Sequence, residues 1–156
     1  INFPTPQPNA KYAKKRLVHV NHLMLYRPLL AIGATVTLRT DSKPLRDYAL
    51  GQFAAAGYNT LWVSDNGRRD HPEHPETEYE CRTREMGAAV YGICATPGAQ
   101  PSDEQLAAGR AQKQSLACYL PDDLDELTYV PLGMEEAVEN FKNRARKGKK
   151  RLPLES

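Results

Sequence analysis

Three prolines near the N-terminus constrain this chain more than any other feature of its sequence. Pro4, Pro6 and Pro8 lie in the stretch 3–16, which reads FPTPQPNAKYAKKR. Each proline lacks a backbone donor, fixes φ near −65° and biases the residue before it toward an extended conformation. We therefore expect a stiff, irregular loop that leads into an apolar pattern of helical period starting at Leu17.

A cluster of cations follows the prolines in the same stretch: Lys11, Lys14, Lys15 and Arg16. Positioned cations gain most from a polyanion such as nucleic acid, so the stretch is a candidate anion-binding edge. A solvated run of charges that serves solubility is the alternative interpretation. The net charge of +2 does not decide between them, because an acidic block at 122–139 precedes a basic block at 142–151. That basic tail could equally contact RNA or form a solubilising terminus.

The size and composition of the chain indicate one ordinary domain. With 156 residues and 40% hydrophobic content, we expect a single core. Three widely spaced cysteines without a C-x-x-C pair argue against a disulfide framework or a zinc ribbon and fit a reducing cytoplasm. No apolar run approaches the roughly 20 residues that would span a bilayer, so we expect no membrane segment. The chain opens on Ile1 in a stretch resembling a strand end, which suggests that it begins within a fold.

The first two thirds of the chain alternate between helix and strand patterns. Such an order favours an α/β sheet with helical crossovers. The predicted elements are a strand end at 1–3, a helix at 17–32 broken near Arg27 by Pro28, a strand at 34–39, a helix capped by Asp41 or Ser42 and closed by Gly57, a strand at 60–63, a long polar loop at 64–75, a short helix or extended segment at 77–86, and a buried strand at 88–95.

The last third of the chain predicts a mostly helical extension. A linker at 97–102 precedes a helix from Asp103 to about Leu116, and an acidic, broken segment occupies 121–131. A final helix is expected at 134–147, because its apolar residues fall on one face: Met134, Ala137, Val138 and Phe141.

Four short motifs occur in the order and spacing of a known family. They are Phe3-Pro4-x-Pro6, Lys14-Lys15-Arg16, Thr40-Asp41 and Thr77-x-Tyr79-Glu80. Together they resemble the F-P-D-P-W, K-x-x-x-x-K-R-R, T-D and T-x-[YF]-E motifs of the bacterial tRNA (guanine-N7-)-methyltransferases. The resemblance covers about residues 1–96 and corresponds to the C-terminal half of the family.

The resemblance implies an α/β fold, namely the C-terminal half of a Rossmann-like, class I S-adenosylmethionine-dependent methyltransferase sheet. Residues 1–96 would form this partial domain, without the N-terminal half that carries the glycine-rich cofactor loop, and residues 97–156 would form the extension. The implied activity is methyl transfer from S-adenosylmethionine to N7 of the variable-loop guanine in tRNA, in the cytoplasm.

Residue by residue, the resemblance implies roles for several side chains. The substrate-binding positions fall on Asp41, Thr77 and Glu80, and the tRNA-binding arm falls on Lys11, Lys14, Lys15 and Arg16. Thr5 stands at the family's catalytic aspartate, Gln7 at its tryptophan, and Asn9 at its substrate-binding lysine. A catalytically inactive, RNA-binding relative is therefore the alternative to an active enzyme, and an α/β interaction module is a third.

The chemistry of these side chains suits guanine methylation. Guanine N7 has an exposed lone pair, so alignment with the methyl donor does most of the work and can contribute about 7–11 kcal/mol at its best. A carboxylate such as Asp41 can accept from guanine N1–H and the N2 amino group, and it stabilises the cationic product. Two local roles compete with this interpretation: Asp41 as a helix N-cap, and Thr77 with Glu80 as a capping box.

The polar loop at 64–75 also contains two histidines and a glutamate, His71, Glu73 and His74. Pro72 between them and Pro75 directly after them oppose a helical ligand pair, and the sequence offers no further ligand nearby, so we expect no metal site. Trp62 and Tyr58 could stack on bases, but strand aromatics usually belong to the core, which is the interpretation favoured here.

Overall fold

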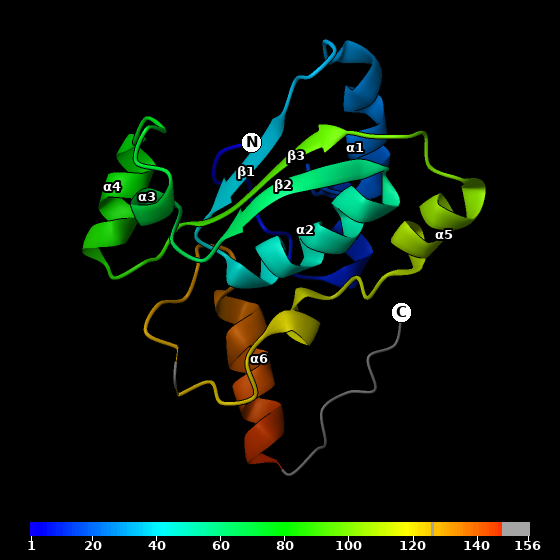
Figure 1. Cartoon of the computed structure of the whole chain (residues 1–156). Coiled ribbons are helices and arrows are strands. Elements are labelled where there is room, and N and C mark those ends of the chain that lie inside the picture. Colours follow the sequence, from blue (N-terminus) through cyan, green and yellow to red (C-terminus); the bar gives the residue numbers. More distant parts are fainter. Residues whose placement is uncertain (126, 148–156) are drawn as a thin grey trace.

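A small antiparallel sheet forms the centre of the computed structural model, which describes residues 1–125 and 127–147 (Figure 1). Within that part of the chain the sheet has the strand order β1-β3-β2. The strands are β1 (Val36–Thr40), β2 (Tyr58–Ser64) and β3 (Tyr91–Pro97). Because β3 runs antiparallel to both neighbours, β1 and β2 point the same way, as a helical crossover between them requires.

The N-terminal residues pair with the other edge of β1. Asn2 forms a parallel bridge with Arg39, and the Arg39 backbone donates to Ile1 O at 2.9 Å and accepts from Phe3 N at 2.7 Å. The strand end expected at 1–3 is thus a short parallel partner of β1. The loop that follows has positive φ at Phe3 (47°) and Gln7 (51°), which is uncommon for residues other than glycine.

Helices surround the sheet, and their bounds follow local signals in the sequence. They are the 3₁₀ turn η1 (Ala10–Lys15), α1 (Val20–Tyr26), η2 (Arg27–Leu29), α2 (Lys43–Ala55), α3 (Gly67–Asp70), α4 (Glu78–Glu85), α5 (Asp103–Ala111), η3 (Leu116–Tyr119) and α6 (Glu135–Arg146). The predicted break near Arg27 is confirmed, since η2 with Pro28 replaces the α-helix there. The helix predicted to reach Leu116 was too long, because α5 ends at Ala111 and the chain turns extended at Gln112.

Ser42, not Asp41, caps α2. The Ser42 hydroxyl accepts from Leu45 N at 3.3 Å, and Pro44 occupies the first turn, where its missing donor costs nothing. Of the two candidate caps only Ser42 therefore caps α2, and the Asp41 carboxylate is left for other partners.

One hydrophobic core joins the sheet, the helices and the C-terminal third. Leu38 and Ile93 from the sheet pack with Tyr48 and Phe53 of α2, all fully buried. The last third adds Leu116, Leu120, Leu124, Met134 and Val138 to the same cluster. The described residues of the C-terminal third therefore share the core of residues 1–96. Among the described helices, none has the length and apolarity needed to cross a membrane.

Candidate functional site

Asp41 is the centre of the candidate site. It follows the last residue of β1 and is 7% exposed. Its Oδ2 accepts hydrogen bonds from the hydroxyls of Tyr79 at 3.0 Å and Tyr129 at 2.7 Å. Tyr79 belongs to α4 and Tyr129 to the segment before α6, so three separate parts of the chain meet at one carboxylate oxygen.

The two tyrosines stay protonated and hence remain donors at neutral pH. Burial and the bond to the negatively charged Asp41 both raise the pKa of Tyr129. Burial and the same carboxylate raise the pKa of Tyr79 to about 12. Since both phenols meet Oδ2, the other oxygen, Oδ1, is the one left for a ligand: no donor to it is found within residues 1–125 and 127–147.

The irregular loop at residues 3–9, which contains the three prolines and is called the proline loop below, contacts this site through an aromatic pair. The rings of Phe3 and Tyr79 lie 5.1 Å apart between centroids, tilted by 53°. Phe3 has positive φ, a conformation that surrounding contacts must stabilise. The loop and the first turn of α4 therefore fix one another beside Asp41.

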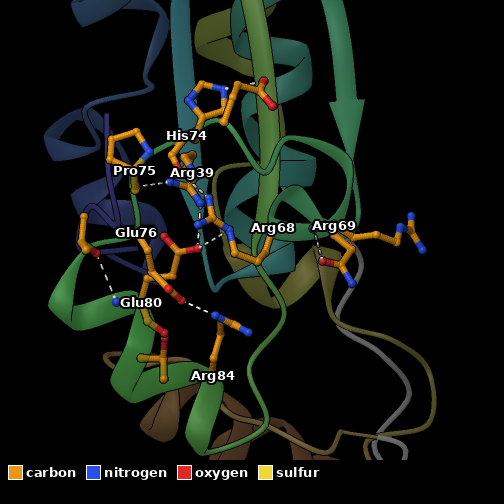
Figure 2. A network of polar contacts seen from close by, with 12 residues as sticks. Arg39, Arg68, Arg69, His74, Pro75, Glu76, Glu80 and Arg84 are labelled. Atoms are coloured by element: carbon orange, nitrogen blue, oxygen red, sulfur yellow. Dashed lines mark hydrogen bonds and ion pairs between the residues drawn. The ribbon is translucent and has the colours of Figure 1, made fainter.

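Glu80 lies in a buried ionic network adjacent to this site. Its carboxylate is fully buried, with Oε1 2.7 Å from Arg39 Nη2 and 3.5 Å from Arg68 Nε (Figure 2). Glu80 Oε2 and Arg68 Nε have no hydrogen-bond partner in the described part of the chain, so the Arg68 contact is an ion pair without hydrogen-bond alignment. The network joins β1, α3 and α4.

Thr77 acts as the N-cap of α4. Its hydroxyl accepts from Glu80 N at 3.1 Å. The Glu80 side chain points to Arg39 and not back to the Thr77 backbone, so only half of the capping box expected from the sequence forms. Thr77 is therefore a local structural partner of Glu80, and the two do not meet Asp41 directly.

The four cations of the proposed arm separate into two groups. Lys11, Lys14 and Lys15 are exposed, and the ammonium groups of Lys11 and Lys15 lie 4.8 and 4.9 Å from the ring centroid of Tyr12. Arg16 is 1% exposed. The structure therefore presents three exposed cations, two of them over one exposed aromatic ring, with the fourth in the interior.

Arg16 holds the proline loop from inside. Its guanidinium donates to Pro6 O at 3.1 Å and to Gln7 O at 2.7 Å, and it lies 4.4 Å from the ring centroid of Tyr48. Burial lowers its pKa from the usual arginine value. This arginine satisfies carbonyls of a loop that has no regular hydrogen bonds of its own.

Thr5 and Asn9 lie on the exposed side of the same loop. Both side chains are exposed, and Asn9 precedes η1 without forming a side-chain cap. Within the described part of the chain, the side-chain hydrogen bonds to Asp41 come from Tyr79 and Tyr129, and neither Thr5 nor Asn9 donates one.

Sequence reasoning missed three members of the site, Arg39, Arg68 and Tyr129. An arginine inside the β-branched segment 34–39 was a usable signal, because a strand cation facing the core needs a buried partner. Arg68 and Tyr129 lie in polar segments without such a signal, and only the folded chain brings them to Glu80 and Asp41.

The loop after β2 brings together the residues for which no metal site was expected. Atoms of His71, Glu73 and His74 suited to metal binding lie within 4.8 Å of one another. His71 also stacks on Trp62, with ring centroids 3.7 Å apart and an interplanar angle of 21°. Pro72, which lies between His71 and Glu73, thus does not keep these side chains apart.

Comparisons with known proteins add evidence from outside the structure. The model of a family described as "Putative methyltransferase" matches residues 1–93. A tRNA (guanine-N(7)-)-methyltransferase of Streptococcus equi subsp. zooepidemicus (strain MGCS10565) is 31% identical over 98 residues, covering 62% of this chain and 46% of that protein. Proteins of the same name from Alkaliphilus metalliredigens (strain QYMF) and Alkaliphilus oremlandii (strain OhILAs) are 32% and 34% identical, covering 62% and 58% of this chain and 45% and 44% of their own lengths. The chain therefore spans a little under half the length of these relatives.

Proposed function

Because the chain belongs to this putative methyltransferase family, as the order of its motifs predicts, we propose that it forms the guanine-facing part of a tRNA (guanine-N7-)-methyltransferase. The observation that carries this proposal is the arrangement at Asp41. The carboxylate lies at the C-terminal end of a strand, where open α/β sheets bind their ligands, and two tyrosines fix its orientation.

The sheet supports a Rossmann-like interpretation of residues 1–96. Residues 1–3 run parallel to β1, and β3 lies antiparallel between β1 and β2. In this proposal, further parallel strands of a Rossmann-like sheet would lie on the side of residues 1–3 away from β1. In this proposal residues 97–156 are an extension whose described part adds Tyr129 to the site.

Asp41 would recognise the guanine edge opposite the reacting nitrogen. Its Oδ1 can accept from guanine N1–H or the N2 amino group, while Oδ2 stays bound to the two phenols. A second contact from the same base requires one tyrosine to move away from Oδ2. Methylation leaves a positive charge on the base, which a nearby carboxylate stabilises.

The residues of this chain do not form a complete S-adenosylmethionine site. The sequence has no glycine-rich cofactor loop, and Thr5 and Asn9 supply neither a carboxylate nor an ammonium group in the proline loop. When bound, S-adenosylmethionine supplies an electrophilic methyl group. The role proposed for the present residues is to bind and orient the guanine, so that N7 is positioned for transfer.

Exposed cations beside the proline loop would bind the tRNA backbone. Lys11 and Lys15 lie over the exposed ring of Tyr12, and Lys14 is exposed on the same 3₁₀ turn. Ammonium groups neutralise phosphates without reading sequence, and an exposed ring can stack on an unpaired base. A tRNA substrate agrees with an action in the cytoplasm.

The decisive experiment measures 7-methylguanosine in tRNA after incubation with labelled S-adenosylmethionine. It uses the native polypeptide, including any residues that precede Ile1, and Asp41→Asn as the variant. We expect product with the native protein and a loss on the order of 100-fold or more with Asp41→Asn, as for removal of a group that stabilises transition-state charge. Salt-dependent tRNA binding without product would identify the inactive, RNA-binding relative instead.

A further inference from the structure

We propose that His71, Glu73 and His74 form a binding site for a divalent transition-metal ion of the Zn²⁺ class. The His71 Nδ1 lies 3.3 Å from Glu73 Oε1, and the His74 Nε2 lies 3.8 Å from the same oxygen. Two imidazoles and one carboxylate are a donor set that Zn²⁺ uses in catalytic sites, with a fourth position left open.

The spacing of these atoms suits a common metal ion. With metal–ligand distances of about 2.0–2.1 Å, two ligands of a tetrahedral zinc ion lie ~3.4 Å apart. The observed separations of 3.3 and 3.8 Å bracket this value, and all three ligand atoms lie within 4.8 Å. Two of the three separations are therefore close to the tetrahedral value, and ion binding would bring the third pair, the two imidazoles, to the same spacing.

One ligand is held in place by aromatic packing. The His71 ring stacks on Trp62 at 3.7 Å. The Trp62 ring is itself confined on the sheet, since a Cβ added at Gly92 would come within 2.8 Å of its Cζ3. His71 is thus positioned before any ion binds, which lowers the cost of ordering it.

The buried ionic network holds the other end of the loop. Arg39 Nη1 donates to Pro75 O at 3.0 Å, and Arg68 Nη2 donates to His74 O (Figure 2). Both guanidinium groups also contact Glu80. The backbone next to His74 is therefore anchored to the core, while its imidazole remains 30% exposed and accessible to an ion.

The charges around the cluster permit a cation there. Arg68 contacts Glu80, and Arg69 forms an ion pair with Asp70 at 2.7 Å. The cations nearest in sequence therefore already have carboxylate partners. Glu73 is 66% exposed and, in the described part of the chain, its carboxylate contacts the two imidazoles and forms no ion pair with a Lys or Arg, so its negative charge is available to the metal.

Trp62, the single tryptophan of the chain, provides a direct readout. Ni²⁺ has an open d shell and quenches an indole in contact with its ligand, so titration with Ni²⁺ should quench the fluorescence of the native protein. Zn²⁺ should bind with a stoichiometry of one per chain by calorimetry and should displace Ni²⁺. Mg²⁺ should not compete, because imidazole ligands disfavour it.

Two variants test the assignment. His74→Gln and Glu73→Gln each remove one ligand. Loss of a residue that only supports a ligand lowers metal affinity roughly 10–100-fold, so each of these variants should weaken Zn²⁺ binding by more than that. His22→Gln is the matched control, because His22 contacts Arg16 O on a different part of the surface, and it should bind Zn²⁺ like the native protein.

The proposal is wrong if Zn²⁺ shows no saturable binding at micromolar concentrations, in which case the three side chains only contact one another. It is equally wrong if His74→Gln and Glu73→Gln bind as tightly as the native protein. Circular dichroism of the metal-free variants verifies that they are folded. These measurements need neither tRNA nor S-adenosylmethionine, so their outcome is independent of the proposed methyl transfer.

Discussion

Replacing Glu80 with glutamine tests the buried ionic network most directly. Glu80 is fully buried, and its partner Arg39 is only 4% exposed. Removing one partner of a buried pair leaves an uncompensated charge and typically costs about 3–5 kcal/mol. The amide oxygen of the introduced glutamine could still accept one hydrogen bond from Arg39, so we expect the lower end, a loss of about 3 kcal/mol in the free energy of unfolding.

The same helix supplies a matched control. Glu78→Gln makes the identical chemical change two residues earlier, but Glu78 is 80% exposed and pairs only with Arg82 one turn on, within the described residues. Such surface pairs contribute about 0.3–0.5 kcal/mol. Urea unfolding followed by circular dichroism gives the free energy of unfolding of both variants. These free energies should differ by more than about 2 kcal/mol, because the loss is about 3 kcal/mol for Glu80→Gln and about 0.3–0.5 kcal/mol for Glu78→Gln.

A second variant separates the lost charge from lost packing. Arg39→Met combined with Glu80→Met removes the buried pair, keeps side chains of similar length and leaves only Arg68, which is 21% exposed, without its ion pair. Such a replacement of a buried pair is often neutral. We expect the double variant to be more stable than Glu80→Gln alone. If Glu80→Gln costs less than about 1 kcal/mol, the buried charge is not held as the structure indicates, and the reasoning from burial fails.

Three further predictions concern the site, the cations and a buried histidine. Tyr129→Phe removes one of two donors to Asp41 and should lower the free energy of unfolding by about 1.5 kcal/mol, the low end for a bond to a charged group, because Tyr79 remains; denaturant titration measures it. Lys14→Ala with Lys15→Ala should weaken tRNA binding and reduce the slope of log affinity against log salt by roughly 1.4–1.8; an unchanged slope would refute phosphate contacts. Burial, with nearby cations, lowers the pKa of His19 from 6.5 to about 4. Between pH 6.5 and 4 the unfolded chain therefore binds more protons than the folded one. The free energy of unfolding should fall by up to about 3 kcal/mol over this pH range. His19→Asn keeps an N-cap acceptor for α1 and should flatten this dependence.

Local signals predicted much of the fold. Ser42 followed by Pro44 marks the start of α2, and Pro28 marks the break after α1, because both depend on backbone chemistry within one turn. The insertion of β3 between β1 and β2 could not be predicted in this way. It depends on which strands bury their faces together, and the alternation of helices and strands does not encode that order.

The cation cluster shows why composition alone could not define the site. Lys14, Lys15 and Arg16 are consecutive and look equivalent in the sequence. In the folded chain Arg16 turns inward, because the proline loop presents carbonyls at Pro6 and Gln7 that need donors. Carbonyl groups about ten positions earlier in the chain thus determine which of the three cations is buried.

The adjacent residues Tyr79 and Glu80 tie the start of α4 to the end of β1 by two different bonds. Tyr79 donates to Asp41, and Glu80 pairs with Arg39, two residues before that aspartate. Because one turn of helix carries both contacts, displacement of Glu80 would also move the phenol that orients Asp41. The family resemblance assigns Glu80 to the substrate, yet a fully buried carboxylate engaged by two arginines cannot reach a base in this conformation. In the proposed function, its effect on guanine binding would therefore pass through Tyr79. Tyr79→Phe should then weaken the proposed guanine recognition while leaving the Arg39–Glu80 pair intact.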